Sequence, residues 1–373
     1  MKVALVHDYI KEYGGAEKVL EVLHEIFPKA PIYTSVFLPK YLGPNKEKFM
    51  KMKIIPTWFQ SIPFNAKLIS PFRLIAGKVF KNINFDKYDL VLVSSTGAYI
   101  PNEITKGKAK QICYCHTPPR YLYGYMTARD LTKNKIIKFI ADIANHFLRI
   151  EDFYASQNVD LYIANSKEVK ARIQKFYRKN SIVINPPIET PKLKEAPVSI
   201  KNRGYYIAGG RLARAKRIDI AVMTATKMGI PLKIFGREFA GYGKELKEMA
   251  GPTVEFLGEI REEEKEKLFS GARAYLSPSI DEDFGMLNVE MMAYGTPVIA
   301  HRSGGALETV VEGKTGLFFD EPTSTSLEKA IKKFEKTNFD PKEIINHANK
   351  FSKDRFIKEI KRTVQKYAGA SRS

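Results

Sequence analysis

Residues 273–300 read RAYLSPSIDEDFGMLNVEMMAYGTPVIA, and this stretch decides the fold. An apolar run over 273–277 is followed by a polar loop, a helical segment over 286–294 and a second apolar run over 297–300. Short apolar strands joined through a helix are typical of a βαβ unit, whose strands are parallel and buried on both faces. The stretch therefore predicts a parallel sheet covered by helices.

The same alternation continues along both halves of the chain. In the second half, further strands are expected at 204–208, 231–235, 253–257 and 316–319. Helices are expected between them at 217–228, 241–250, 261–271 and 304–312. In the first half, strands are expected at 2–7, 31–36, 89–94, 110–114 and 160–164, with helices at 15–27 and 134–157. The pattern predicts an α/β protein of two doubly wound, Rossmann-like domains that face each other across a cleft.

A proline-rich stretch separates the two halves. Residues 185–203 (NPPIETPKLKEAPVSIKNR) hold four prolines and show no apolar periodicity. We expect an N-terminal domain over 1–190, a C-terminal domain over 200–350, and an amphipathic C-terminal helical segment over 351–373.

Composition excludes several classes of protein. The 373 residues are 44% hydrophobic and 27% charged, as in ordinary globular proteins rather than disordered or collagen-like chains. The two cysteines, Cys113 and Cys115, cannot frame a disulfide scaffold and favour a reducing compartment. No apolar run reaches the length of about 18 residues that spans a membrane. We therefore expect a cytoplasmic protein.

The net charge of +20 is concentrated in the first half. Residues 1–190 hold 29 basic and 16 acidic side chains, and residues 29–81 hold ten basic side chains and one acid, Glu47. Such a surface attracts phosphates, whether of a nucleic acid, an anionic lipid or a diphosphate substrate. Residues 53–81 also mix bulky apolar groups with the lysines and contain the only tryptophan, Trp58. They suit either contact with an anionic membrane or helices that pack on the domain with their lysines in solvent.

Glu282 and Glu290 flank the most informative motif, EDFGMLNVE. Glu282 follows a predicted strand, and Phe284, Gly285 and Met286 open a helix whose free N–H groups can hold a phosphate. Taken alone, two glutamates eight positions apart equally describe a solvated helix end.

The intact block resembles the Glu-x7-Glu signature of retaining glycosyltransferases with the two-domain GT-B fold, specifically the GT4 family. The spacing, the internal Phe-Gly and the downstream Gly-Thr-Pro-Val-Ile-Ala all agree. The resemblance implies that Glu282 holds hydroxyls of the donor sugar and Glu290 those of the ribose. It also implies that the C-terminal helix crosses back to the first domain.

A second motif, GRLARAKRID (210–219), directly follows a predicted strand. Arg211 and Lys216 can hold a diphosphate, since a guanidinium donates two parallel hydrogen bonds and an ammonium group supplies a compact positive charge. A basic helix start on the protein surface would have a similar sequence. The GT4 resemblance implies that these two side chains neutralise the leaving nucleoside diphosphate. Arg214 and Arg217 are interpreted as surface residues.

A glycine turn and a histidine are the candidate site residues of the first half. Gly15, in HDYIKEYGGAEKVL (7–20), suits a loop against a phosphate but equally a plain tight turn. Glu17 is interpreted as a helix-start charge rather than a catalyst. His116, in CYCHTPPRY (113–121), ends a predicted strand, and no second Cys or His pair nearby supports a metal site. The other histidines carry no pattern of their own: His7, His24, His146, His301 and His347.

CYCHTPPRY, VHDYIKEYGGAEKVL, IANSKEV and VINPPIE resemble a GT4 branch that includes O-antigen mannosyltransferases. This resemblance implies that Gly15 closes over donor phosphate or acceptor, and that His116 hydrogen-bonds the transferred sugar. A satisfied structural histidine is the alternative for His116.

The resemblance, which covers nearly the whole chain, implies a retaining hexosyltransferase that needs neither metal nor cofactor. The branch implies mannose from GDP-mannose, moved to a glycan or lipid-linked acceptor in cell-surface polysaccharide biosynthesis. The base would contact the loop at Gly258 and Ile260, and a UDP-sugar donor stays an alternative. A lipid-linked acceptor would fit a peripheral enzyme at the inner face of the cell membrane.

Functions of other classes remain as rivals. A nucleic-acid-binding protein would explain the charge, but the chain shows no recognition motif and no basic residues interleaved with aromatics as in stacking surfaces. A GT-B isomerase of nucleotide sugars would need further carboxylates for proton abstraction, and none stands out. A non-catalytic scaffold is disfavoured because each position of the expected clamp is filled.

Overall fold

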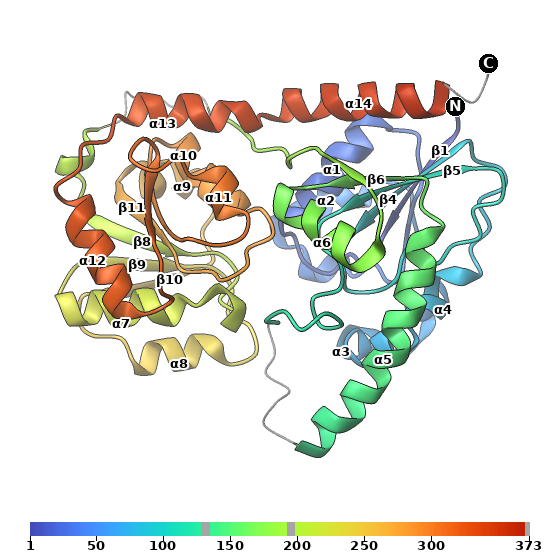
Figure 1. The fold of residues 1–373 in the computed structure, drawn as a ribbon, viewed down its shortest axis with the longest axis horizontal. Helices are drawn as coiled ribbons and strands as arrows, with labels where there is room; N and C mark the ends of the chain where they lie inside the picture. Colours follow the sequence, from blue (N-terminus) through green and yellow to red (C-terminus); the bar gives the residue numbers. More distant parts are fainter. Residues whose placement is uncertain (128–134, 192–197, 370–373) are drawn as a thin grey trace. The chain divides into compact units, whose positions relative to one another are not determined.

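Parallel strands form two separate sheets, as the alternation of apolar runs and helices predicts. The computed structural model describes residues 1–127, 135–191 and 198–369. Every strand pair within each of the two sheets is parallel. The α/β prediction with two doubly wound, Rossmann-like units is confirmed (Figure 1).

The chain divides into two units. Unit 1 comprises Met1–Tyr125, Leu131–Pro187 and Asp354–Ser373, and unit 2 comprises Met126–Asp130 and Ile188–Lys353. The change from one unit to the other falls within the proline-rich stretch and again at the start of the last helix. Each unit is described by itself below.

Unit 1 contains a seven-stranded sheet in the order β3-β2-β1-β4-β5-β6-β7. Its strands are β1 (Val3–His7), β2 (Ile32–Thr34), β3 (Ile54–Pro56), β4 (Leu90–Ser95), β5 (Lys110–Cys115), β6 (Leu161–Ala164) and β7 (Ser181–Val183). Its α-helices are α1 (Gly15–Ile26), α2 (Lys46–Met50), α3 (Asn65–Leu68), α4 (Ala76–Lys81), α5 (Lys135–Gln157), α6 (Lys167–Tyr177) and α14 (Lys353–Gly369). The central strands β1 and β4 are buried along their whole length, which explains their continuous apolar runs.

Unit 2 contains a six-stranded sheet in the order β10-β9-β8-β11-β12-β13. Its strands are β8 (Tyr205–Gly209), β9 (Leu232–Phe235), β10 (Val254–Gly258), β11 (Ala272–Ser277), β12 (Val298–His301) and β13 (Gly316–Phe319). Its α-helices are α7 (Ile218–Met228), α8 (Tyr242–Glu248), α9 (Glu262–Ser270), α10 (Met286–Ala293), α11 (Ala306–Thr309), α12 (Ser324–Phe334) and α13 (Pro341–Ala348). All six strands expected in this half are present, each within one residue of its predicted bounds.

The C-terminal helix α14 completes the core of unit 1. Phe356, Ile360 and Val364 recur every four residues and are buried, so one face of the helix is apolar and inward-facing. The Phe356 ring meets Tyr114 of β5 edge-on, with ring centroids 5.6 Å apart. The last segment of the chain is thus part of the N-terminal core.

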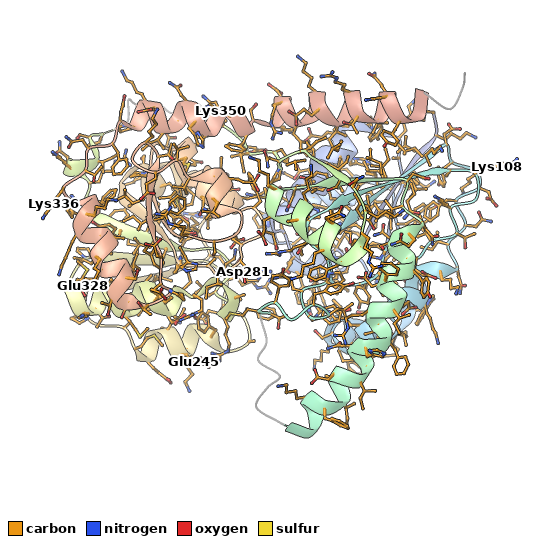
Figure 2. All side chains as sticks on the ribbon, viewed as in Figure 1. Lys108, Glu245, Asp281, Glu328, Lys336 and Lys350 are labelled. Atoms are coloured by element: carbon orange, nitrogen blue, oxygen red, sulfur yellow. The ribbon has the colours of Figure 1, made fainter. Side chains whose placement is uncertain are left out.

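Charged side chains lie on the outer surface of the helices. Figure 2 shows Glu328 on the outer side of α12 with Lys336 just beyond the helix. Glu328 accepts hydrogen bonds from Lys227 and Lys332 at 2.8 and 2.7 Å. Among the helices of the described ranges, none combines the length and the apolar character needed to cross a membrane.

Replacing Phe356 by alanine tests the role of α14. The substitution removes a fully buried ring, so we expect the free energy of unfolding to fall by about 3 kcal/mol or more. Thermal unfolding followed by circular dichroism measures this loss. Tyr367→Ala, on an exposed position of the same helix, is the control and should cost under about 0.5 kcal/mol. Equal losses in the two variants would show that α14 is not held through this face.

Candidate functional site

Lys216 and Glu282 meet at the carboxyl edge of the unit 2 sheet. The Lys216 Nζ donates to both carboxylate oxygens of Glu282, at 2.7 and 2.6 Å. Lys216 lies in the turn after β8 and Glu282 in the loop after β11, and these two strands are neighbours in the sheet. Sixty-six residues of sequence separate the pair, yet the parallel sheet brings both loops to one edge. Because the pair is partly exposed, it stabilises the fold by about 1 kcal/mol or less.

The backbone turns along this edge approach one another so closely that a side chain would not fit. A Cβ at Gly236 would lie 1.7 Å from the carbonyl oxygen of Gly210, and Gly236 has a φ of +119°. The Gly236 N–H also donates to the carbonyl of Gly258 at 2.7 Å. Gly258, predicted to contact the base, is therefore joined through Gly236 to the turn that leads into Arg211. Ile260, its predicted partner, is half-buried two residues further on.

The loop that carries Glu282 is held by the segment after β12. The Gly305 N–H donates to the Glu282 carbonyl at 2.7 Å, and the Asp281 N–H donates to Ser303 Oγ at 3.1 Å. A Cβ at Gly305 would lie 2.3 Å from the Cα of Phe284. This close packing fixes the backbone from Asp281 to Phe284.

His301 supports the same loop, a role that the sequence alone does not indicate. Its Nδ1 lies 2.8 Å from Ser303 Oγ and its Nε2 lies 3.1 Å from the carbonyl of Asp320. Burial lowers the pKa of His301. The only available signal was its position directly after a predicted strand, two residues before Ser303 and the two glycines that follow.

Helix α10 begins where the motif predicts. Gly285 is its N-cap with a φ of +85°, and the Asn288 N–H donates back to the Gly285 carbonyl at 2.9 Å. Phe284 is buried and Met286 is half-buried. The Phe284 side chain thus anchors the helix start in the core, beside the Glu282 backbone.

Glu290 lies on α10 and is half-buried. Burial raises the pKa of Tyr275, and the negative charges of Glu282 and Glu290 add to this effect. The Tyr275 O–H donates to the carbonyl of Gly209 at 3.2 Å.

The three arginines of the second motif lie in different surroundings. Arg211 is exposed, with its guanidinium 5.8 Å from the centre of the Phe239 ring. Arg214 forms a two-pronged ion pair with Glu245 across the start of α8. Arg217 pairs with Asp219, two residues further along the chain.

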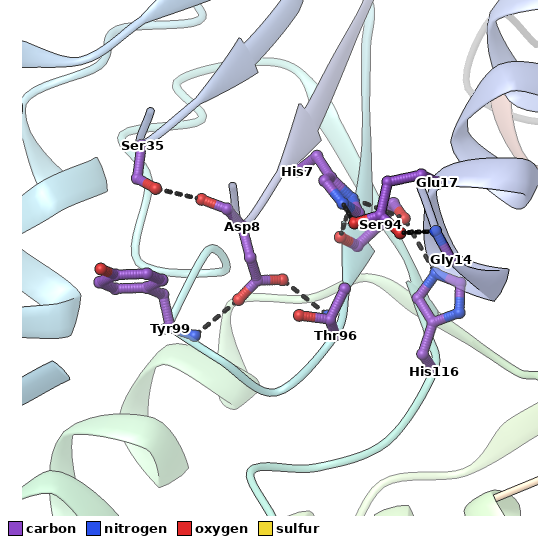
Figure 3. Close-up of polar contacts among 9 residues, drawn as sticks. All are labelled: His7, Asp8, Gly14, Glu17, Ser35, Ser94, Thr96, Tyr99 and His116. Atoms are coloured by element: carbon purple, nitrogen blue, oxygen red, sulfur yellow. Dashed lines mark hydrogen bonds and ion pairs between the residues drawn. The ribbon is translucent and has the colours of Figure 1, made fainter. Parts of the chain in front are cut away.

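In unit 1, His116 belongs to a buried cluster of polar side chains (Figure 3). His116 Nε2 lies 3.0 Å from Ser94 Oγ, and the same hydroxyl lies 3.1 Å from His7 Nδ1. His7 Nε2 lies 3.7 Å from a carboxylate oxygen of Glu17. The other Glu17 oxygen accepts the Gly14 N–H at 2.9 Å, which confirms Glu17 as a helix-start charge.

The cluster links three strands and the glycine turn. His7, Ser94 and His116 stand at or just beyond the ends of β1, β4 and β5, which are consecutive in the sheet. Gly15 is the first residue of α1, one position after the Gly14 N–H that binds Glu17. His7 is thus no incidental histidine, although only its position beside the glycine turn hinted at this.

Burial keeps His116 neutral. Desolvation, followed by the neighbouring charge of His7, lowers the pKa of His116 to about 3. Its carbonyl accepts a hydrogen bond from Asn165 Nδ2 at 2.9 Å, which fixes the backbone there. A neutral imidazole can donate from one ring nitrogen and accept at the other.

Asp8 is a second buried group that the sequence does not single out. Its two oxygens accept the Thr96 and Tyr99 N–H groups, both at 2.6 Å, and the Ser35 hydroxyl donates to its carbonyl. Burial is the largest influence on Asp8 and raises its pKa. The carboxylate ties the loop after β4 to the end of β1.

Cys113 and Cys115 are buried, and neither forms a disulfide. Within the described part of the chain, no three His, Cys, Asp or Glu side chains are grouped closely enough to hold a metal ion.

Residues 189–351 match the family model of glycosyl transferases group 1. The α-1,3/1,6-mannosyltransferase ALG2 of Dictyostelium discoideum is 25% identical over 327 residues, covering 75% of this chain and 76% of that protein. Residues 189–351 are therefore a glycosyltransferase group 1, GT4-type domain, and the chain is a glycosyltransferase.

Solved structures agree on the fold of this glycosyltransferase. Sucrose-phosphate synthase from Thermosynechococcus elongatus superposes with a TM-score of 0.74 at 17% identity, covering 99% of this chain and 100% of that one. HepE from Anabaena, solved in complex with UDP and glucose, superposes with a TM-score of 0.69 at 19% identity, covering 98% and 99%. The predicted GT-B fold and enzyme class are confirmed.

The lowered pKa of His116 predicts a pH dependence of stability. Below pH 6.5 the unfolded chain binds a proton at this imidazole and the folded chain does not. The free energy of unfolding should therefore fall by about 1.4 kcal/mol per pH unit as the pH drops toward 3. Urea unfolding at a series of pH values measures the slope.

The control for this prediction is His116→Gln, which keeps a polar partner for Ser94 but cannot titrate. Its stability should fall less steeply in the same pH range, by the contribution of one proton. Identical slopes for the two proteins would contradict a neutral, buried His116.

Proposed function

We propose that this glycosyltransferase moves mannose, with retention, from GDP-mannose to a glycan or lipid-linked acceptor in cell-surface polysaccharide biosynthesis. The observation that carries the proposal is the contact of Lys216 with Glu282 beside the start of α10. A cation, a carboxylate and a helix N-terminus at one sheet edge suit a ligand that combines a diphosphate with a sugar.

Lys216 and Arg211 would neutralise the diphosphate, together with the N–H groups from Phe284 to Met286. The barrier to transfer lies in departure of the diphosphate while positive charge develops at the anomeric carbon. Fixed positive groups aimed at the leaving phosphate lower that barrier without reorganisation. In this proposal they take the place of a metal ion, and neither metal nor cofactor is needed.

Donor binding would exchange the partner of Lys216, from the Glu282 carboxylate to the donor phosphate. Lys216 Nζ binds both Glu282 oxygens, so each charge neutralises the other. An incoming phosphate would compete for Lys216 and release the Glu282 oxygens to accept hydrogen bonds from sugar hydroxyls. Phosphate binding would thus prepare the sugar site.

The roles of the remaining residues follow from the resemblance to the GT4 family. Glu290 would bind the ribose hydroxyls, and the backbone at Gly258 and Ile260 would contact the base. In unit 1, His116 would hydrogen-bond a hydroxyl of the transferred sugar, held by Ser94. Gly15 would let the turn before α1 approach the donor phosphate or the acceptor.

The choice of mannose is supported by the curated relative, which is itself named a mannosyltransferase. HepE, a structural neighbour, was solved with UDP and glucose. A UDP-sugar donor is therefore the second candidate within the same enzyme class.

Calorimetric titration with GDP and UDP, in EDTA, tests the donor site. We expect micromolar GDP binding that survives EDTA and weakens at least about tenfold in Lys216→Ala, since a charge-assisted contact of this kind contributes about 1.5–3 kcal/mol. Arg214→Ala is the matched control, because this basic residue of the same turn binds Glu245 instead. It should bind GDP as the unmodified enzyme does.

Each other outcome changes a defined part of the proposal. A preference for UDP keeps the enzyme class and overturns GDP-mannose. Loss of binding in EDTA overturns metal independence. Equal weakening in Lys216→Ala and Arg214→Ala would show that general charge, not the Lys216 contact, holds the phosphate.

Glu282→Gln tests the exchange between carboxylate and phosphate. Removing the carboxylate charge frees Lys216, so GDP should bind as tightly as before or up to about fivefold more tightly, within the 1 kcal/mol of such a pair. Hydrolysis or transfer of the donor sugar should nevertheless fall, because the sugar loses its carboxylate. Calorimetry and product analysis measure the two effects separately. Weakened GDP binding together with unchanged turnover would contradict the exchange.

A further inference from the structure

Helix α5 carries a row of large apolar side chains that face away from unit 1. Six of them are exposed by 44–67%: Phe139, Ile140, Ile143, Phe147, Ile150 and Tyr154. At 100° per residue they fall within about one third of the helix circumference. We call this row the α5 stripe. Single exposed apolar residues are ordinary, but a continuous row of six marks an interaction surface.

The C-terminal half of α5 is firmly packed through its opposite face, which fixes the helix on unit 1. Leu148 and Ala155 are buried in unit 1. Asp152, also buried, accepts hydrogen bonds from the hydroxyls of Tyr123 and Tyr177 at 2.8 and 3.2 Å. The helix therefore presents the stripe outward from a fixed base. Figure 1 shows its first turns extending past the other elements of unit 1.

Neighbouring segments add apolar side chains beside α5. The short 3₁₀ helix Pro71–Ile75 packs against α5 and exposes Leu74. Its Phe72 ring lies 6.1 Å from the ring of Trp58, which is itself 44% exposed. Residues 53–81 were predicted either to meet a membrane or to pack on the domain. In the structure this stretch contains side chains that suit each alternative. Phe59 and Phe80 are buried in the domain, whereas Trp58 and Leu74 are exposed.

The charge around these elements indicates which partner the stripe fits. Residues 29–81 hold ten basic side chains and one acidic one. On α5 itself the charges that flank the stripe are mixed, Asp142 and Glu151 as well as Lys138 and Arg149, so the excess positive charge comes from the neighbouring segments. A shallow hollow on the helix is lined by His146, Arg149, Ile150, Phe153 and Tyr154. A second copy of this chain would bring the same positive charge and be repelled. An anionic surface with an apolar interior complements both features.

We propose that the α5 stripe docks on an anionic phospholipid bilayer. The apolar side chains enter the boundary between headgroups and acyl chains, and lysines of the neighbouring segments contact the headgroup phosphates. Each basic residue near such a surface contributes about 1 kcal/mol, which adds to the burial of the stripe. The proposal concerns where the enzyme works and does not depend on the identity of its donor.

The single tryptophan allows a direct test in the full chain. Trp58→Phe combined with Phe147→Trp moves the only indole onto the α5 stripe. Trp58→Phe combined with Met223→Trp is the matched control, since Met223 is exposed on α7 of unit 2. Both variants are mixed with vesicles of phosphatidylglycerol and phosphatidylcholine in equal parts, or of phosphatidylcholine alone. Circular dichroism verifies that both are folded.

With the anionic vesicles, the Phe147→Trp variant should shift its emission to the blue and be quenched by brominated acyl chains. The Met223→Trp variant should do neither, and phosphatidylcholine alone should give a weak response in both. In vesicle sedimentation, the double variant Phe139→Ser with Phe147→Ser should lower the fraction of protein bound to vesicles at least about tenfold. The reason is that it removes two rings that would be buried in the bilayer.

Three results would overturn the proposal. In the first, the unmodified chain sediments with vesicles while the Trp placed at 147 does not respond, so another surface binds. In the second, binding is equal with and without phosphatidylglycerol, so charge has no part. In the third, no vesicle binds and the chain forms a dimer that the double serine variant abolishes, so the stripe serves a second copy.

Discussion

The close backbone contact at the carboxyl edge of the unit 2 sheet is the constraint on which the candidate donor site depends. Gly210 and Gly236 lie in the turns after β8 and β9, Gly258 is the last residue of β10, and Gly236 can hold its place only without a side chain. Because these segments are pressed together, the turn that leads to Lys216 starts from a fixed point. Glu282 lies after the neighbouring strand β11, where Gly305 holds its loop, and so Lys216 and Glu282 reach each other. The contact is thus a consequence of parallel strand order and not of local sequence.

The sequence was sufficient to predict a strand where burial on both faces of the sheet made the apolar run continuous. The central strands of both units are of this kind. The edge strand β10 is only partly buried but was still predicted, because it is five residues long, and the helix over Glu290 was predicted at its observed start. Strands β3 and β7 were missed because they are three-residue edge strands that are incompletely buried, so no apolar run marks them. Helix α6 was also missed, although Ser166 caps it by accepting the Val169 N–H at 3.0 Å.

The parts of the site that the sequence did not predict are supporting residues. Lys216 and Glu282 stood out because the family resemblance implies a role for each, whereas it implies none for His301 or for His7, which begins the stretch HDYIKEYGGAEKVL. Their importance comes from position: His7 shares the Ser94 hydroxyl with His116, and His301 holds Ser303. Such contacts join residues that are 87 or 22 positions apart, as with His7 and Ser94 or Ser94 and His116. Only the strand order shows that these residues are neighbours.

Helix α5 is a second case in which the sequence predicts an element but not its contacts. Its apolar residues surround most of the helix, and a helix that is apolar on nearly all sides is ordinarily buried on all sides. In unit 1 only one face finds a protein partner, through Leu148, Ala155 and the bonded Asp152. The sequence predicts the helix but cannot state which of its apolar faces the core will cover. Folding of this unit uses one of them and leaves the other exposed, next to the most basic part of the chain. A face that contributes nothing to the core and costs solubility requires a partner, and the surrounding positive charge favours a negatively charged one.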